Sequence, residues 1–212
     1  MTETWMIDNL ERIGGLAVDV LGHPRIVEAP TGRGLWFDGV GDGIVLPAHP
    51  LDGAACYTAE VIFCPASGGA REQRFFHMQE SAGEDRILFE TRLTPRATWY
   101  LDTFIQSGLA SQAQLAHDHE HPLDAWVHAA LVYDGREMRH YVDGRMEMSH
   151  PIACPPPRAG RTSIGVRMNR VFWYRGAICA ARFASEALAP EAFWRPQGLA
   201  TDLHDAIYEG VI

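Results

Sequence analysis

Short runs of alternating apolar and polar residues recur through this 212-residue chain at intervals of roughly ten positions. Tight-turn pairs that favour positive φ follow several of these runs, among them Asp38-Gly39, Asp134-Gly135 and Asp143-Gly144. Helical periodicity is scarce. This pattern is typical of paired antiparallel strands, and the spacing predicts an all-β sandwich or barrel.

The alternation predicts ten strands, over residues 34–37, 43–46, 57–64, 74–79, 86–92, 98–105, 126–133, 138–142, 162–167 and 177–183. Two segments are helix candidates: residues 6–13, which are equally consistent with a strand and a loop, and residues 190–194, where Pro190 suits a first helical turn. Residues 202–212 carry weak order signals. Glycine and proline do not gather into a linker, so we expect one domain over residues 1–212.

Charge and hydrophobicity limit the classes of partner. The formal net charge is −9, and the field of such a protein repels nucleic acid and anionic membranes. No stretch approaches the length of a transmembrane helix, and the N-terminus lacks the basic and apolar regions of a secretory signal. We therefore expect a cytoplasmic protein that binds neither nucleic acid nor membrane. The sequence makes no prediction of its oligomeric state.

Residues with metal-binding chemistry lack the spacing of a metal clip. Cys56, Cys64, Cys154 and Cys179 form no Cys-x-x-Cys pair, and we expect four free, buried thiols. Three histidines occupy every second position of residues 116–121, directly before a proline. We expect a solvated loop there rather than a zinc site, which needs three converging side chains.

Several segments share their order and composition with a known family. They are residues 34–43 with their Phe-Asp-Gly turn, 57–63, 126–135 with Trp-x-His, 141–144, 163–165, 176–183 and 188–193. Together they resemble laminin G-like domains of the concanavalin A-like lectin/glucanase superfamily, over roughly residues 34–194. The resemblance implies a jelly-roll β-sandwich of two antiparallel sheets. The superfamily contains lectins, adhesion modules, glycoside hydrolases and polysaccharide lyases, so the fold alone does not fix the function.

Two departures from the family bear on its chemistry. Members often carry an aspartate in the closing strand that helps to bind calcium, but Cys179 stands at that place here. A thiol is a poor ligand for a hard cation, so we expect no cofactor, although Asp38 and Asp42 remain as oxygen ligands for calcium. The glucanase pattern Glu-x-Asp-x-x-Glu is absent, which argues against ordinary β-glucanase chemistry.

Polar side chains recur at every second position of three consecutive predicted strands, so we expect them to share one sheet face. The resemblance implies that this face is the concave saccharide site. Guanidinium groups match a carboxylate or sulfate, and aromatic rings stack on a pyranose. We predict an open groove for an acidic oligosaccharide, bounded by Trp99 or Tyr100. Its predicted lining is Gln73, Phe75, His77, Arg86, Glu90, Arg92 and Asp102, with Arg167 and Asn169 at the rim.

The sequence leaves three functions open. The first is carbohydrate recognition on this face. The third, which applies to many laminin G-like domains, is a protein-interaction module. The second is an enzyme acting on the same sugar. In a lyase, Arg86 or Arg92 would neutralise a uronate, His77 would remove the C5 proton and Tyr100 would protonate the leaving oxygen.

A hydrolase is the other version of the enzyme. It would pair Glu90 with Asp102 or with Glu60, and the separation of the two carboxyl groups would set the stereochemistry.

Overall fold

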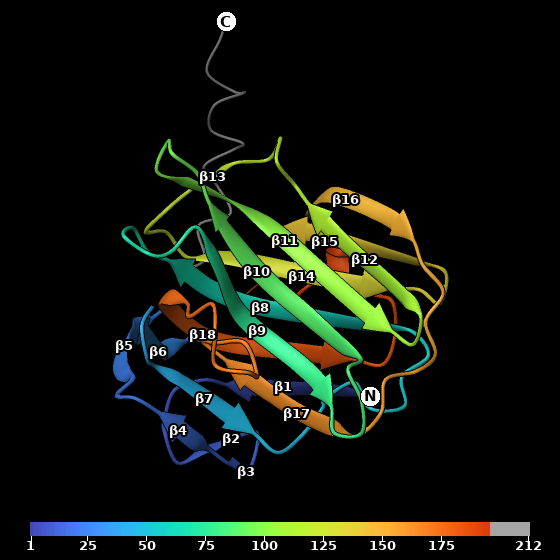
Figure 1. Cartoon of the computed structure of the whole chain (residues 1–212), viewed down its shortest axis with the longest axis horizontal. Helices are drawn as coiled ribbons and strands as arrows, with labels where there is room; N and C mark the ends of the chain where they lie inside the picture. The colour runs from blue at the N-terminus through green and yellow to red at the C-terminus, as the bar shows by residue number, and fades with distance from the viewer. Residues whose placement is uncertain (196–212) are drawn as a thin grey trace, which may run out of the picture.

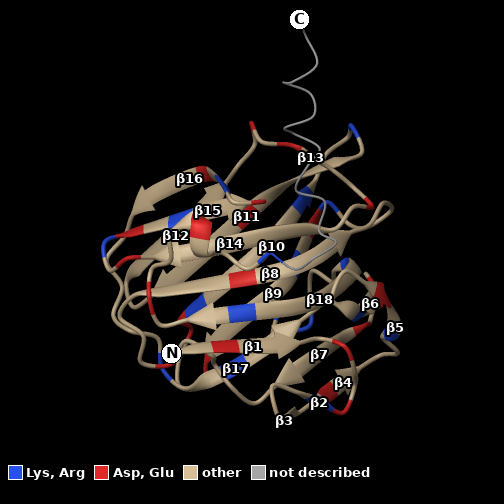
Figure 2. Ribbon diagram, turned by 180° about the vertical axis from the view of Figure 1, so that it is seen from behind, with Lys and Arg blue, Asp and Glu red and all other residues tan. Residues whose placement is uncertain are grey.

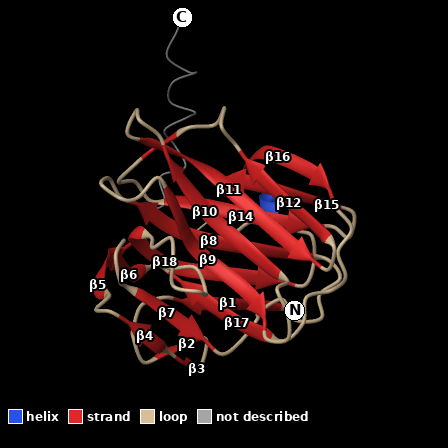
Figure 3. Cartoon of the chain, in the orientation of Figure 1, coloured by secondary structure: helices blue, strands red, loops and turns tan. Residues whose placement is uncertain are grey.

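Two large antiparallel sheets pack face to face in the computed structural model, which describes residues 1–195 (Figure 1). Strands and loops make up nearly all of this part of the chain, as Figure 3 shows. The predicted weak order of residues 202–212 lies outside the described residues. The all-β sandwich predicted from the alternation is confirmed.

The sheet nearer the viewer in Figure 1, here called the front sheet, has the order β12-β11-β10-β9-β17-β7-β4, and β13 pairs with β11. Its strands are β4 (Asp19–Leu21), β7 (Gly43–Leu46), β9 (Glu72–Glu80), β10 (Arg86–Leu93), β11 (Thr98–Ser107), β12 (Ala110–Leu115), β13 (His121–Pro122) and β17 (Gly160–Ile164).

The back sheet has the order β16-β15-β14-β8-β18-β6-β5, and β1 pairs with β18 beyond the end of β6. Its strands are β1 (Thr2–Met6), β5 (Arg25–Ala29), β6 (Gly32–Asp38), β8 (Tyr57–Pro65), β14 (Val127–Tyr133), β15 (Glu137–Val142), β16 (Arg145–Pro151) and β18 (Arg175–Ala184). A small hairpin of β2 (Arg12–Ile13) and β3 (Leu16–Ala17) and the 3₁₀ turn η1 (Pro190–Ala192) complete the described elements.

All ten strands predicted from the sequence are present, with ends that differ by a few residues. Residues 6–13 form the end of β1, a loop and β2, so the strand-and-loop alternative is right and the helix is wrong. Residues 190–194 contain a single 3₁₀ turn. Among residues 1–195, no helix has the length and apolar character needed to cross a membrane.

Aromatic side chains from both sheets fill the space between them. Phe63 of β8 stacks on Phe75 of β9 with ring centroids 4.2 Å apart, and Trp99 of β11 meets Phe63 edge-on at 5.4 Å. All three side chains are fully buried. Burial of each large apolar side chain stabilises the fold by roughly 2–3 kcal/mol. These contacts fix the inner face of the front sheet and so determine which side chains face outward.

Candidate functional site

A β-bulge in β9 decides which of its side chains reach the outer face of the front sheet. Phe76 pairs with Phe89 and Arg74 pairs with Glu90, so Phe75 is an extra residue without a partner in β10. Because side chains alternate with a period of two, the extra residue exchanges the two faces of β9 for every position before it. Arg74 therefore joins Glu90 on the outer face.

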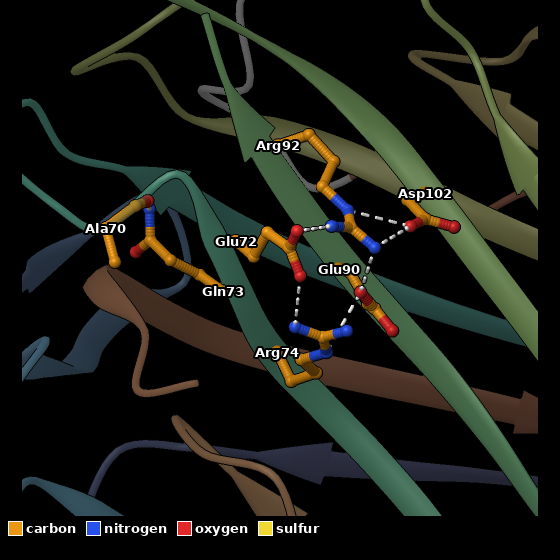
Figure 4. A network of polar contacts seen from close by, with 7 residues as sticks. All are labelled: Ala70, Glu72, Gln73, Arg74, Glu90, Arg92 and Asp102. Carbon is orange, nitrogen blue, oxygen red and sulfur yellow. Dashed lines mark hydrogen bonds and ion pairs between the residues drawn. The ribbon is translucent and has the colours of Figure 1, made fainter. Parts of the chain in front are cut away.

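An ion-pair network spans β9, β10 and β11 on this outer face (Figure 4). The guanidinium of Arg92 contacts three carboxylates: Glu72 at 2.7 Å through Nη1, Glu90 at 3.1 Å through Nη2, and Asp102 at 2.7 Å through Nη2. Its Nε donates to Asp102 at 2.9 Å as well. Arg74 bridges Glu72 and Glu90 at 3.1 and 2.9 Å. Every nitrogen of Arg92 is therefore engaged within the chain.

Two carboxylates of this network are buried although they lie on an outer face. The side chains of Glu90 and Asp102 are 4% and 2% exposed. Burial, together with the charge of Asp102, raises the pKa of Glu90, and burial also raises the pKa of Asp102. The predicted open groove is therefore wrong at its centre, where ion pairs close the surface.

Aromatic rings border the network on two sides. The guanidinium carbon of Arg74 lies 3.7 Å from the ring centroid of Phe172, and the ring of Tyr100 lies 4.7 Å from that of His117. Phe172 has φ of 58°, and Arg170 in the same loop has φ of 61°. Such values cost a bulky residue roughly 1–3 kcal/mol, and strain of this kind is concentrated at ligand sites.

His77 lies beside this loop and is 1% exposed. Its Nδ1 accepts a hydrogen bond from the backbone N–H of Met168 at 2.9 Å. Burial, followed by the charges of Arg167, Arg86 and Arg74, lowers the pKa of His77 to about 3, so the ring is neutral. Since Nδ1 is an acceptor, the proton of the neutral ring is on Nε2.

The Nε2–H group of His77 is buried and has no hydrogen-bond partner among residues 1–195. An unpaired buried donor costs about 1–3 kcal/mol. The Nε of Arg86 is likewise without a partner in this part of the chain. Arg86 Nη1 donates to the carbonyl of Glu84 at 2.7 Å, and its guanidinium carbon lies 5.1 Å from the ring centroid of Phe104. These two unused donors are the polar groups in the site that most need an explanation.

The structure brings together most of the residues predicted for the site. His77, Arg86, Glu90, Arg92, Tyr100 and Asp102 lie on the outer face of the front sheet. Arg167 is half-buried and Asn169 is exposed, both in the loop over His77.

Three predicted positions are wrong. The bulge turns Gln73 inward, where it donates to the carbonyl of Ala70 at 2.8 Å and accepts the N–H of Arg175 at 2.7 Å. It also turns Phe75 into the core. Trp99 lies in the core beneath β13 and donates to the carbonyl of Pro122 at 3.0 Å, so it cannot border an outer groove.

Sequence reasoning missed Glu72 and Arg74, because a strict alternation assigns them to the inner face. It also missed Phe172. The succession Phe75-Phe76, with apolar residues at adjacent positions of an otherwise alternating strand, is the one sequence signal that marks the extra residue.

The outer face of the back sheet, which is turned toward the viewer in Figure 2, also holds a cluster of charged residues. Glu60 of β8 accepts from His128 at 2.9 Å and pairs with Arg182 of β18. It also accepts the backbone N–H of Trp194 at 2.7 Å, and Arg182 donates to the carbonyl of Ala192 at 2.7 Å. The segment around η1 therefore covers Glu60 and Arg182, and both carboxylate oxygens of Glu60 and the Nε2 of His128 have partners.

Residues 116–121 differ from the expected solvated loop. His117 is exposed, but His121 is half-buried, bonds to Glu147 at 2.8 Å and lies over Trp99 at 4.9 Å. In the described part of the chain, no three His, Cys, Asp or Glu side chains are arranged to hold a metal. Asp38 accepts three backbone N–H groups of its own turn at 2.8–3.0 Å.

Known structures share this fold. Domain 4 of a GH43 extracellular arabinanase from Geobacillus stearothermophilus, in complex with arabinotriose, is 17% identical with a TM-score of 0.63 and covers 89% of this chain and 94% of its own. Trypanosoma rangeli sialidase is 16% identical with a TM-score of 0.65, covering 94% of this chain and 32% of its own. At these identities the likeness concerns the fold alone.

A heptameric pentraxin from Limulus polyphemus, 13% identical with a TM-score of 0.54, covers 89% of this chain and 78% of its own. The comparison with curated protein sequences found no match. A family model described as the Concanavalin A-like lectin/glucanases superfamily matches residues 38–192, which is most of the chain. The resemblance drawn from the ordered segments is thereby confirmed, and the chain belongs to the Concanavalin A-like lectin/glucanases superfamily.

Proposed function

We propose that this protein is a carbohydrate-recognition domain that binds an acidic oligosaccharide on the outer face of the front sheet. One observation carries the proposal: on the outer face of the front sheet two neighbouring buried donors, His77 Nε2–H and Arg86 Nε, have no partner among residues 1–195, whereas on the back sheet the segment around η1 binds Glu60 and Arg182, and the unpaired buried Nε of Arg139 stands alone. A buried donor without a partner requires an explanation, and a ligand that accepts hydrogen bonds is one that fits two such donors side by side. The saccharide complex known for a structural neighbour, the arabinanase domain, is consistent with a sugar as the ligand.

The geometry favours recognition over lyase chemistry. A lyase base at His77 would need a free ring nitrogen to take the C5 proton. Nδ1 is occupied by the Met168 N–H, and Nε2 already carries the proton of the neutral ring. His77 therefore donates a hydrogen bond and has no lone pair directed at a substrate.

A glycoside hydrolase is the second candidate, because Glu90 and Asp102 contact the same Nη2 of Arg92, at 3.1 and 2.7 Å. Two carboxyl groups close together, with the pKa of Glu90 raised by burial, suit a retaining mechanism, in which the separation is about 5–5.5 Å. Both carboxylates are buried and tied to Arg92, however, so a substrate would first have to displace that side chain. Recognition at His77 and Arg86 leaves the ion pairs of Arg92 in place. The alternative pair, Glu90 with Glu60, is excluded because the two residues lie on opposite outer faces.

The test is a binding panel of neutral and uronate-containing oligosaccharides, measured by calorimetry with the wild-type chain. We expect binding of acidic oligosaccharides that weakens in Arg167→Ala, since Arg167 lies in the loop over His77. The matched control is Arg139→Ala. Arg139 lies on β15 of the back sheet, where it pairs with Asp134, so this variant should bind normally. Turnover of any glycan, seen as new reducing ends or unsaturated products, would favour the enzyme, and no binding at all would overturn the proposal.

A further inference from the structure

The buried donor of His77 is fixed in place by a contact from a distant part of the chain. Met168 N–H, 91 positions later in the sequence, binds Nδ1 and so determines both the ring orientation and the tautomer. The ring is 1% exposed, and its Nε2–H has no partner among the residues that the structure describes. A tautomer fixed by backbone leaves this side chain one role toward a ligand, which is to donate.

Positive charge surrounds this donor. Leu88 pairs with His77 across the strands, and Arg86, two positions away on the same face of β10, is a diagonal neighbour at about 7 Å. Arg167 directly precedes Met168 in the loop over the ring. The chain contains no lysine, so every fixed positive side chain is a planar guanidinium.

The acidic residues near Arg86 do not pair with its Nε. Glu84 lies 3.9 Å from Arg86 Nη1, but its side chain is 85% exposed. Asp85 accepts the backbone N–H of Gly108 with both carboxylate oxygens, at 2.8 and 2.9 Å. Arg86 Nε keeps no partner in residues 1–195.

We propose that His77 Nε2–H, Arg86 and Arg167 form an anion subsite that takes one carboxylate or sulfate group, with Arg92 playing no direct part. The unfilled groups are donors, so the ligand atom must be an acceptor, and the guanidinium groups select a charged one. Arg92 is excluded because its nitrogens already bind Glu72, Glu90 and Asp102. The inference rests on the proposed function only in taking a sugar as the molecule that carries the anionic group. A free inorganic anion such as sulfate offers the same acceptor oxygens.

The test compares two substitutions at one position. In His77→Asn the side-chain oxygen takes the place of Nδ1, so the Met168 contact is kept and the Nε2–H donor is removed. In His77→Gln the side-chain nitrogen takes the place of Nε2, so the donor is kept. We expect glucuronate and sulfate to shift the ¹⁵N imidazole signal of wild-type His77, while glucose does not. Affinity for glucuronate should fall about tenfold or more in His77→Asn and Arg86→Gln, and less in His77→Gln.

The outcomes separate the subsite from the proposed function. Binding of neutral oligosaccharides to the outer face, with no response to glucuronate or sulfate, would overturn the subsite and leave carbohydrate recognition standing. Binding of sulfate and glucuronate, with no affinity for any oligosaccharide, would support the subsite and overturn carbohydrate recognition. Equal glucuronate affinity in His77→Asn and in the wild type, with the folded state verified by its NMR spectrum, would overturn the role of His77. Arg139→Gln should leave every affinity unchanged.

Discussion

Two buried histidines on opposite faces of the sandwich show how differently its outer faces are used. His128, on the back sheet, donates to Glu60 at 2.9 Å and lies 5.7 Å from the ring of Phe193, under the segment around η1. His77, on the front sheet, is as deeply buried but has an unused Nε2–H. The same residue type has a paired Nε2 on one face and keeps an unpaired donor on the other. The difference comes from what covers each ring.

The largest expected effect is on the front-sheet network. Arg92→Ala would leave the buried carboxylates of Glu90 and Asp102 without their main cation, and we expect a loss of about 4 kcal/mol in the free energy of unfolding. Urea denaturation measures it. Arg96→Ala removes an exposed guanidinium from Glu120 and should cause no measurable loss. Equal behaviour of the two variants would show that the network is an ordinary surface array.

The cover of the back sheet gives the next largest effect. Phe193 is 5% exposed and packs edge-on against Tyr141 at 5.1 Å, so Phe193→Ala should destabilise the protein by about 3 kcal/mol. Hydrogen exchange at the Trp194 amide, which binds Glu60, should accelerate in the same variant. Unchanged protection of that amide would show that the segment does not seal the back sheet.

The pH dependence of stability distinguishes the front-sheet histidine. Burial lowers the pKa of His77 to about 3, below the ordinary value of 6.5, so the unfolded chain binds more protons at acid pH. This residue therefore contributes a loss of stability as the pH falls from about 6.5 towards 3, with a slope of about 1.4 kcal/mol per pH unit. His77→Asn should lack that contribution and so lose stability less steeply between pH 6 and 4.

His49 and His140 are also buried and have lowered pKa values, about 4 and about 3. These two histidines and Glu90, whose pKa is raised, are present in the wild type and in His77→Asn alike. The difference between wild type and His77→Asn therefore isolates one group. Urea unfolding at several pH values measures it, and identical slopes would mean that His77 is protonated in the folded state.

The smallest expected effect concerns calcium. Asp38 is occupied by its own turn, and Cys179 is fully buried in β18, so thermal melts with calcium and with chelator should agree. A rise of several degrees in the melting temperature on adding calcium would contradict this prediction and would indicate a metal site at the Asp38 turn.

The sequence predicts the ten main strands and the family because both depend on local alternation and turn pairs, such as Asp134-Gly135. It predicts most of the outer face of β10 and β11 for the same reason. It fails in β9, where one extra residue at Phe75 reverses the faces and hides Glu72 and Arg74 from a strict alternation.

Other features of the site depend on long-range contacts that no local pattern carries. The tautomer of His77 is set by Met168, and the cover over Arg74 is the ring of Phe172. Strands β12 and β16 escaped prediction because they lie at sheet edges and are rich in polar residues, which weakens their alternation.

Chemical-shift mapping with a uronate-containing oligosaccharide tests the central claim most directly. The ligand is titrated into ¹⁵N-labelled protein and every backbone amide is followed. Binding on the front sheet predicts shifts in β9, β10, β11 and the loop that holds Met168, together with a change at His77 Nε2, while β8, β14 and β18 stay unchanged. Shifts confined to the back sheet, or no shifts at saturating ligand, would contradict it.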